Sequence, residues 1–132
     1  MEYTIQVKGK LHQRELNTLF ATNNWQVDDL SKLEKSIKNA WCYITARDTN
    51  NKLIGYVQVI SDGILHAYIL RLIVHPESRN NGLGTKLMEE IMKIINNENM
   101  KPTLVAVPGK EKFYEKFGFK REINGLVAML QR

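Results

Sequence analysis

The sequence predicts an α/β (α+β) fold with a mixed, largely antiparallel central sheet and helices on both faces. Strand-like runs separated only by short polar turns indicate antiparallel hairpins. A strand–helix–strand stretch over residues 64–104 indicates a parallel pair joined by a right-handed crossover. Two helical segments near the N-terminus supply a further layer. We expect about six to seven strands and about four helices in a single domain, residues 1–132.

The first half of the chain contains one isolated strand, two helices and a hairpin. Residues 3–7 alternate apolar and polar side chains, as a half-buried strand does. Helices are predicted near residues 12–21 and 28–39, the second with apolar residues at i, i+3 and i+7. Residues 41–48 and 52–61 are strand-like and are joined by a polar turn, which predicts a hairpin.

In the second half, a strand over residues 64–76 ends at a proline, and a helix with a clear apolar stripe follows. Residues 101–109 are predicted as a buried strand, and residues 110–117 as a short helix stopped by a glycine. A closing pair of strands, residues 119–123 and 126–132, is expected around the turn Asn-Gly.

The composition is that of an ordinary globular domain, with 43% hydrophobic and 25% charged residues. No apolar run approaches the ~20 residues of a membrane helix, and the first ten residues have no signal-peptide core. Cys42 is the only cysteine, so neither an intrachain disulfide nor a cysteine metal cluster is expected. We therefore expect a cytoplasmic protein with no membrane partner.

The formal net charge of +5 leaves two kinds of partner open. Nucleic-acid binding is one, but the Lys and Arg residues are interspersed with Glu, as on solvated helix faces. We therefore expect no nucleic-acid partner. The charge also suits a small polyanionic ligand.

Gly82 and Gly84 stand where the long helix begins, after a polar loop. Glycine inside a helix costs roughly 1 kcal/mol relative to alanine, so a bare backbone here indicates a function. The unpaired N–H groups and partial positive charge of a helix start attract anions. Arg79 adds a cation, and Asn80 and Asn81 add hydrogen-bond donors. The alternative is a plain loop with two turn glycines.

Two common phosphate-binding patterns do not fit this loop. The dinucleotide fingerprint fails because Leu87 stands where its third glycine belongs. The P-loop pattern fails because Gly84 is followed by Thr85 and then Lys86.

Two motifs resemble those of the Gcn5-related N-acetyltransferase (GNAT) family. LRLIVHPESRNNGLG, residues 70–84, is similar to the family's Arg/Gln-x-x-Gly-x-Gly/Ala motif with its preceding strand. FYEKFGF, residues 113–119, is similar to a second signature, and one helix and one strand separate the two, as in the family. The resemblance covers residues 52–119. It implies transfer of an acetyl group from acetyl-coenzyme A (acetyl-CoA) to a primary amine by direct attack in a ternary complex.

The resemblance also implies where acetyl-CoA binds. Strands beginning near His66 and Thr103 are expected to splay apart, with backbone groups of Leu72, Ile73 and Val74 along the pantetheine arm and thioester. The pyrophosphate is expected on the amide N–H groups of Arg79, Asn80, Asn81, Gly82, Leu83, Gly84 and Thr85.

Tyr114 occupies the position of the family's usual general acid. A phenol with a pKa near 10 can protonate a departing thiolate. The alternative role for Tyr114 is packing beside Phe113 and Phe117, which are spaced i, i+4 on the short helix. We expect these two phenylalanines to complete the cofactor site.

Arg71 stands where relatives often carry an acidic residue, and the loop before Tyr114 lacks a common asparagine. The general base is therefore not identified. His66 and Asp62 are conceivable substitutes, although a strand residue and a turn former are the ordinary roles. Arg71 either reaches the acceptor cleft or points to the opposite face. We take Arg71 and His66 as candidate acceptor-binding residues and expect no metal.

The sequence thus predicts an acetyl-CoA-dependent N-acetyltransferase for a small-molecule or peptide amine, as a monomer or homodimer. A non-catalytic acyl-CoA-binding or regulatory module on the same fold is the alternative, because the usual acidic residue is missing.

Overall fold

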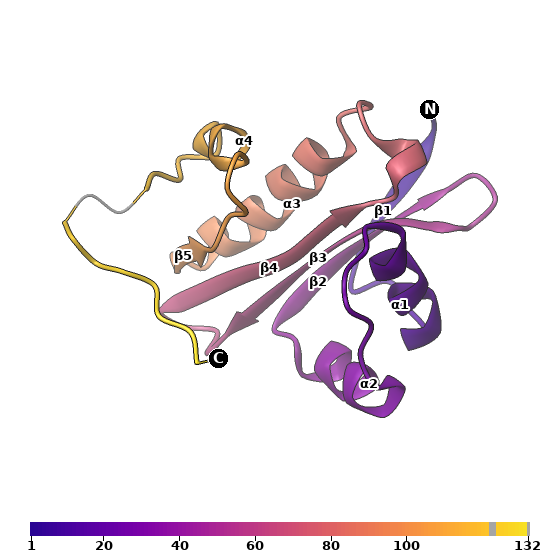
Figure 1. Cartoon of the computed structure of the whole chain (residues 1–132), viewed down its shortest axis with the longest axis horizontal. Helices are drawn as coiled ribbons and strands as arrows, with labels where there is room; N and C mark the ends of the chain where they lie inside the picture. Colours follow the sequence, from indigo (N-terminus) through magenta and orange to yellow (C-terminus); the bar gives the residue numbers. More distant parts are fainter. Residues whose placement is uncertain (122–123, 132) are drawn as a thin grey trace.

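The computed structural model describes residues 1–121 and 124–131. A mixed five-stranded sheet, in the order β1-β2-β3-β4-β5, runs through this part of the chain (Figure 1). The strands are β1 (Tyr3–Val7), β2 (Cys42–Asp48), β3 (Leu53–Ser61), β4 (His66–Val74) and β5 (Lys101–Leu104). The helices are α1 (Gln13–Thr22), α2 (Leu30–Asn39), α3 (Leu83–Asn97) and α4 (Glu111–Glu115), with a 3-10 turn, η1 (Pro76–Ser78), before α3. The predicted mixed α/β fold is confirmed.

The sheet is antiparallel from β1 to β4, and β5 joins β4 in parallel. The parallel ladder runs only from the pair His66–Lys101 to the pair Ile69–Leu104. Because β4 continues to Val74 while β5 ends at Leu104, the two strands part halfway along β4.

A bulge in β4 lies beside this parting. Leu70 stands opposite Gln58 of β3, but Ile73 stands opposite Tyr56, so β4 carries one extra residue. Arg71, inside the bulge, has a φ of 60°, in the left-handed region that few side chains adopt. The bulge changes which residues of β4 face each side of the sheet.

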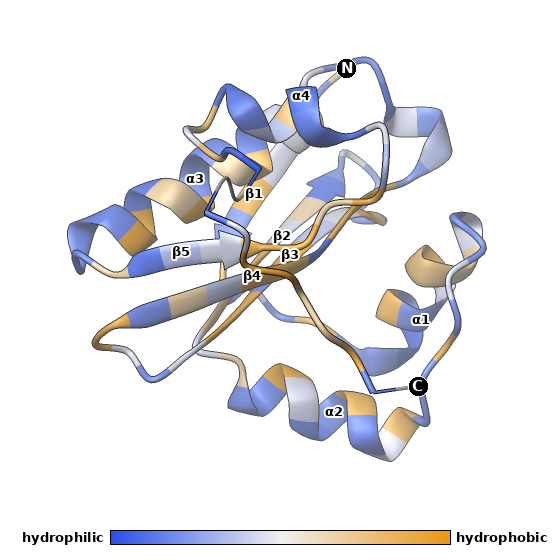
Figure 2. Ribbon diagram, turned by 60° about the vertical axis from the view of Figure 1, so that its left-hand side comes forward, coloured by the Kyte–Doolittle hydropathy of each residue, from blue (hydrophilic) through white to orange (hydrophobic). Residues whose placement is uncertain are grey.

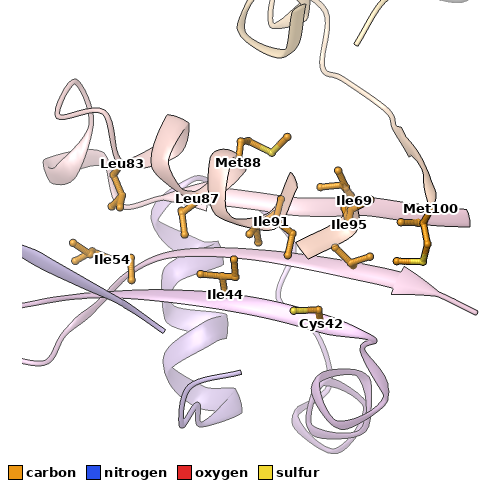
Figure 3. Packing of buried hydrophobic residues seen from close by; sticks show 14 residues of the cluster. Cys42, Ile44, Ile54, Ile69, Leu83, Leu87, Met88, Ile91, Ile95 and Met100 are labelled. Carbon is orange, nitrogen blue, oxygen red and sulfur yellow. The ribbon is translucent and has the colours of Figure 1, made fainter. Parts of the chain in front are cut away.

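Helices cover both faces of the sheet (Figures 1 and 2). α3 packs on one face over a core that includes Ile44, Ile54 and Ile69 (Figure 3). α1 and α2 cover the other face, where Phe20 and Leu33 pack against Tyr56. Both cores consist of buried hydrophobic residues, so they hold β3 and β4 in a fixed frame for the site.

Local signals explain where the N-terminal helices begin. His12 and Glu15 form a capping box at the start of α1, and the Asp29 carboxylate accepts the Lys32 N–H at the start of α2. The observed starts lie one or two residues after the predicted ones.

The predicted closing strands are wrong where the structure describes them. Residues 119–121 and 124–131 contain no strand, and the remainder of the two predicted strands, residues 122, 123 and 132, lies outside the described residues. The predicted strand 101–109 is shortened to β5. A short run of apolar residues beside a turn is a local pattern, whereas a strand needs a neighbouring strand to pair with, and pairing is set by the rest of the molecule. The described sheet therefore has five strands rather than six to seven.

None of the helices in the described ranges has the length and apolar character needed to cross a lipid bilayer.

Candidate active site

A pocket of about 720 Å³ lies where β4 and β5 part. Its walls are the second half of β4, the start of α3 with its preceding loop, and the chain from the end of β5 to α4. The predicted site residues on these walls are Arg71, Leu72, Ile73, Val74, Arg79, Asn80, Gly82, Leu83, Gly84, Thr85, Phe113 and Tyr114. The fold thus brings together two motifs that lie about thirty residues apart in the sequence.

The start of α3 offers free backbone donors to this pocket. Its N-cap, Gly82, has a φ of 74° and no side chain to cap the helix, unlike His12 and Asp29 in α1 and α2. The first N–H groups of a helix have no acceptor within the helix itself. Since Gly82, Leu83, Gly84 and Thr85 all line the pocket, the arrangement can bind an anion.

Four cationic side chains line the pocket, and none of its lining residues is acidic. They are Arg71, Arg79, Lys110 and Lys116. The Lys116 ammonium donates to Thr85 Oγ1 at 3.2 Å and lies 4.7 Å from the centre of the Phe113 ring, which fixes it beside the start of α3. Lys110 and Lys116 were not among the residues predicted for the site, although Lys116 lies within the FYEKFGF motif.

Asn23 at the end of α1 holds one of these cations. Its side-chain oxygen accepts a hydrogen bond from the Arg79 guanidinium, and its amide nitrogen donates to the Val74 carbonyl at 3.2 Å. Asn23 and Trp25 both line the pocket, and no motif in the sequence could have indicated them. They reach the site only because α1 packs across β4.

Arg71 extends from the β4 bulge toward the loop between α1 and α2. Its guanidinium pairs with the Asp28 carboxylate at 2.9 Å and lies 4.9 Å from the centre of the Phe20 ring. Nη1 has no hydrogen-bond partner among the described residues, and the side chain is 31% exposed. Arg71 therefore lines the pocket, and the Asp28 carboxylate partly offsets its positive charge.

Tyr114 lies on the pocket wall formed by α4, with its ring edge-to-face against Phe113 at 5.0 Å between centroids. Burial raises the pKa of the Tyr114 phenol above its ordinary value of about 10. The phenol therefore stays protonated at neutral pH and can donate a hydrogen bond or a proton.

Two residues predicted for the cofactor site lie off the pocket wall. The Asn81 side chain bonds to the backbone carbonyls of Ser78 and Arg79, which stabilises the loop. Phe117 packs against Phe113 with ring centres 5.5 Å apart. Asn81 and Phe117 thus stabilise neighbouring residues that line the pocket.

His66 is not brought to the pocket. It is the exposed first residue of β4, at the end of the strand opposite to the bulge. The Asp62 carboxylate accepts the backbone N–H groups of Ile64, Leu65 and His66, which lowers its pKa. Asp62 is therefore a turn former in this structure.

The described residues contain no group of three or more His, Cys, Asp or Glu side chains that could hold a metal ion.

The fold and the pocket together define the class of protein. A mixed sheet that opens between β4 and β5, over an uncapped helix start and a half-buried tyrosine, is the arrangement that the two motifs predicted for an acetyltransferase. The family model "Acetyltransferase (GNAT) domain" matches residues 38–121. The chain belongs to the GNAT acetyltransferase family.

Relatives and solved structures agree with this assignment. The chain is 29% identical to an uncharacterized N-acetyltransferase ycf52 of Pyropia yezoensis over 87% of this chain and 68% of the relative. The chain is 30% identical to an uncharacterized N-acetyltransferase ycf52 of Gracilaria tenuistipitata var. liui, over 87% of this chain and 65% of the relative. The chain thus spans about two thirds of the length of these relatives. A crystal structure from methicillin-resistant Staphylococcus aureus, described as a probable acetyltransferase, is 26% identical with a TM-score of 0.86, covering 98% of this chain and 99% of that one.

Proposed function

We propose that the protein is an N-acetyltransferase that moves the acetyl group of acetyl-CoA to a primary amine of a small molecule or peptide. One observation carries the proposal within this acetyltransferase family. The uncapped start of α3, four cations and the Tyr114 phenol line a single pocket that contains no carboxylate. Such a pocket suits a donor that combines several phosphate groups with a reactive acyl end.

The residues of the pocket fit this donor by their chemistry. The N–H groups at the start of α3 would hold the pyrophosphate, with Lys116 and Arg79 adding charge. Gly84 leaves the approach open, because even an added Cβ would meet only Phe113 and Val74, at 3.6 and 3.8 Å. The part of β4 that β5 leaves unpaired, Leu72–Val74, offers backbone groups to the pantetheine amides.

In the transfer, the neutral amine attacks the thioester carbon, a C–N bond forms and the C–S bond breaks. Tyr114 is assigned as the acid that gives its proton to the departing sulfur, since its phenol remains protonated up to high pH. The nitrogen releases one proton to solvent as the amide forms, and the Tyr114 phenolate takes one proton from solvent, so the step balances. Backbone dipoles of β4 would stabilise the oxyanion that develops on the thioester oxygen.

The charge of Arg71 should influence which acceptor amine the pocket prefers. A lysine-like amine with a pKa near 10.4 costs about 4.6 kcal/mol to deprotonate at pH 7, and an α-amino group near pKa 8 costs about 1.4 kcal/mol. Asp28 offsets part of the Arg71 charge, and the positive charge that remains beside the acceptor favours the neutral amine and disfavours polycations. We therefore propose an acceptor with a lowered amine pKa or with a carboxylate that pairs with Arg71.

The alternative is a module that binds acyl-CoA without transfer. The observation in its favour is that no carboxylate lines the pocket, so no general base is provided. Calorimetry with acetyl-CoA, followed by a thiol-release assay over a panel of amines, tests both functions. Submillimolar binding with turnover supports the transferase, binding without turnover on any amine supports the module, and no binding rejects both.

The same panel tests the acceptor class. α-Amino acids and peptides with free N-termini should be better substrates than spermidine-like polyamines. Arg71→Glu should reverse that order, whereas Arg71→Gln should only weaken it. A wild-type preference for polyamines that neither substitution changes would reject the role given to Arg71.

A further inference from the structure

Trp25 is a large side chain on the wall of the pocket, yet it remains 38% exposed. It lies in the loop between α1 and α2, and its ring packs against Phe20 with centroids 5.6 Å apart and an angle of 32° between the ring planes. Neither the donor site nor the proton transfer proposed above uses Trp25. An aromatic side chain exposed on a pocket wall gains free energy when a ligand covers it.

The loop that carries Trp25 is fastened on both sides of this residue. The Trp25 backbone N–H donates to the Phe20 carbonyl at 3.1 Å. Farther along, the buried side chain of Asn17 in α1 bonds the backbone of Asp28 twice. Its Nδ2 donates to the Asp28 carbonyl at 2.8 Å, and its Oδ1 accepts the Asp28 N–H at 3.1 Å. Because the loop is held in this way, Trp25 needs little further ordering to bind a ligand.

Trp25 reaches the pocket from the α1 side of the sheet. α1 and α2 cover that face, whereas α3 and the aromatic residues of α4 pack on the other (Figure 2). The donor is assigned to the start of α3 and to α4. Of the side chains assigned to the donor, Arg79 is the one that bonds to α1, through Asn23. The wall that carries Trp25 is therefore available to the acceptor.

Arg71 and Trp25 contact the same phenylalanine. The Arg71 guanidinium carbon lies 4.9 Å from the centre of the Phe20 ring, and the Trp25 ring centre lies 5.6 Å from it. The cation and the indole therefore cannot be farther apart than these two distances laid end to end. Aromatic rings pack with centroids about 4.5–7 Å apart, and a carboxylate meets a guanidinium at about 2.7–2.9 Å. A small molecule with an aromatic ring and a carboxylate a few bonds apart can thus contact both residues.

We propose that Trp25 is a specificity-determining residue and that the preferred acceptor is a free α-amino acid with an aromatic side chain. The proposal rests on the proposed function, in which Arg71 pairs with the carboxylate of the acceptor. The aromatic side chain packs on Trp25, and the amino group is attached to the carbon that joins the side chain to the carboxylate. Arg71 directly precedes Leu72–Val74, the backbone assigned to the pantetheine arm. Pairing with Arg71 therefore brings the nitrogen close to the donor.

Kinetics with phenylalanine and alanine tests the proposal, since both acceptors carry the same amino and carboxylate groups. kcat/KM should be about ten- to a hundredfold higher for phenylalanine, because only its ring reaches Trp25. Trp25→Ala should bring this ratio close to one, mainly through a higher KM for phenylalanine, and Trp25→Phe should retain most of it. Val27→Ala is the matched control, because Val27 is an exposed residue of the same loop that does not line the pocket. A wild-type ratio near one, or a high ratio that Trp25→Ala leaves unchanged, overturns the proposal.

A binding measurement separates failure of this acceptor site from failure of the proposed reaction. The chain has two tryptophans, so Trp41→Phe leaves Trp25 as the only source of indole fluorescence. In this variant, saturated with coenzyme A, phenylalanine should change the fluorescence in a saturable manner, and alanine should change it much less. If this change appears but no amine turns over, the proposed reaction is wrong and the acceptor site is supported. If other amines turn over and phenylalanine causes no change, the acceptor site is wrong and the proposed reaction is supported.

Discussion

Gly82 and Gly84 stand two residues apart, but different physical reasons make them glycine. Gly82 has a positive φ of 74°, and an added Cβ would meet nothing within 4 Å, so the backbone conformation alone disfavours a side chain. Gly84 has an ordinary helical backbone, and a Cβ there would make normal contacts. The protein itself therefore tolerates a side chain at Gly84, and only a ligand bound in the pocket would disfavour one.

Stability measurements should separate the two glycines. Gly84→Ala should raise the free energy of unfolding by about 0.5 kcal/mol, because alanine loses less backbone entropy in a helix. Gly82→Ala should lower it by about 1 kcal/mol, since alanine resists the left-handed conformation. Chemical denaturation checks both, and a stabilising Gly82→Ala would contradict the role of its backbone. In the same proteins, Gly84→Val should weaken acetyl-CoA binding at least about tenfold, or 1.4 kcal/mol, by obstructing the helix start.

Tyr114→Phe should lower kcat by roughly 10²-fold and leave acetyl-CoA affinity nearly unchanged, because only the proton donor is removed. Since burial raises the pKa of this phenol, the wild type should show no loss of kcat from Tyr114 ionisation below about pH 10. Steady-state kinetics over a range of pH measures kcat, and calorimetry measures acetyl-CoA affinity. Unchanged turnover with a lowered melting temperature would return Tyr114 to a packing role.

At the scale of elements, Arg47, near the end of β2, joins three segments of the chain. Its guanidinium bonds both oxygens of Glu15 in α1, at 2.8 and 2.6 Å, and also the carbonyls of Lys10 and Asn51. The Arg47 hydrogen bonds are the main cause that lowers the pKa of Glu15. This link ties the start of α1 to the turn between β2 and β3.

The link makes stability depend on pH in a defined direction. A carboxylate whose folded pKa lies below its unfolded value of about 4.3 contributes fully above that value, and the contribution is lost as the pH falls through the folded pKa. The wild type should therefore lose more stability between about pH 6 and pH 3 than Glu15→Gln does. Urea denaturation across this range is the measurement, and parallel curves for the two proteins would contradict the inference.

The sequence was sufficient for elements whose signals are local. Periodicity, caps and turn residues predicted four helices and the strands β1 to β4, because these patterns depend on near neighbours. It was not sufficient for residues 126–131, whose apolar run predicts a strand that pairs with no strand among the described residues. For the site, the two motifs predicted most of the pocket wall. The sequence could not predict the roles of Asn23, Trp25 and Asp28, the partner of Arg71. Only the packing of the helices brings these residues to β4.

At the scale of the whole molecule, net charge and site charge have the same sign. The chain carries +5, and no acidic residue lines the pocket, although Asp28 pairs with Arg71 from the loop after α1. Long-range attraction should then aid the binding of acetyl-CoA, and salt should screen it.

Acetyl-CoA affinity should fall several-fold between about 0.1 and 1 M salt, as the Debye length shrinks from ~10 to ~3 Å. Lys116→Met should weaken binding at low salt and reduce the salt dependence. Lys38→Met serves as the control, because Lys38 pairs with Glu34 on the outer surface of α2, far from the pocket. Equal salt dependence in all three proteins would contradict an electrostatic role for Lys116.

The short parallel ladder between β4 and β5 also governs how the molecule opens. The ladder has only four residue pairs, and α4 has no buried residue, whereas α3 has five. Residues 105–121 should therefore unfold locally, with the rest of the domain intact, and their amides should exchange with solvent deuterons long before those of α3. A donor bound between β4 and this segment would fasten the two together, so acetyl-CoA should slow exchange there by its full binding free energy. On this view Tyr114 belongs to a region whose folded form is stabilised by its substrate.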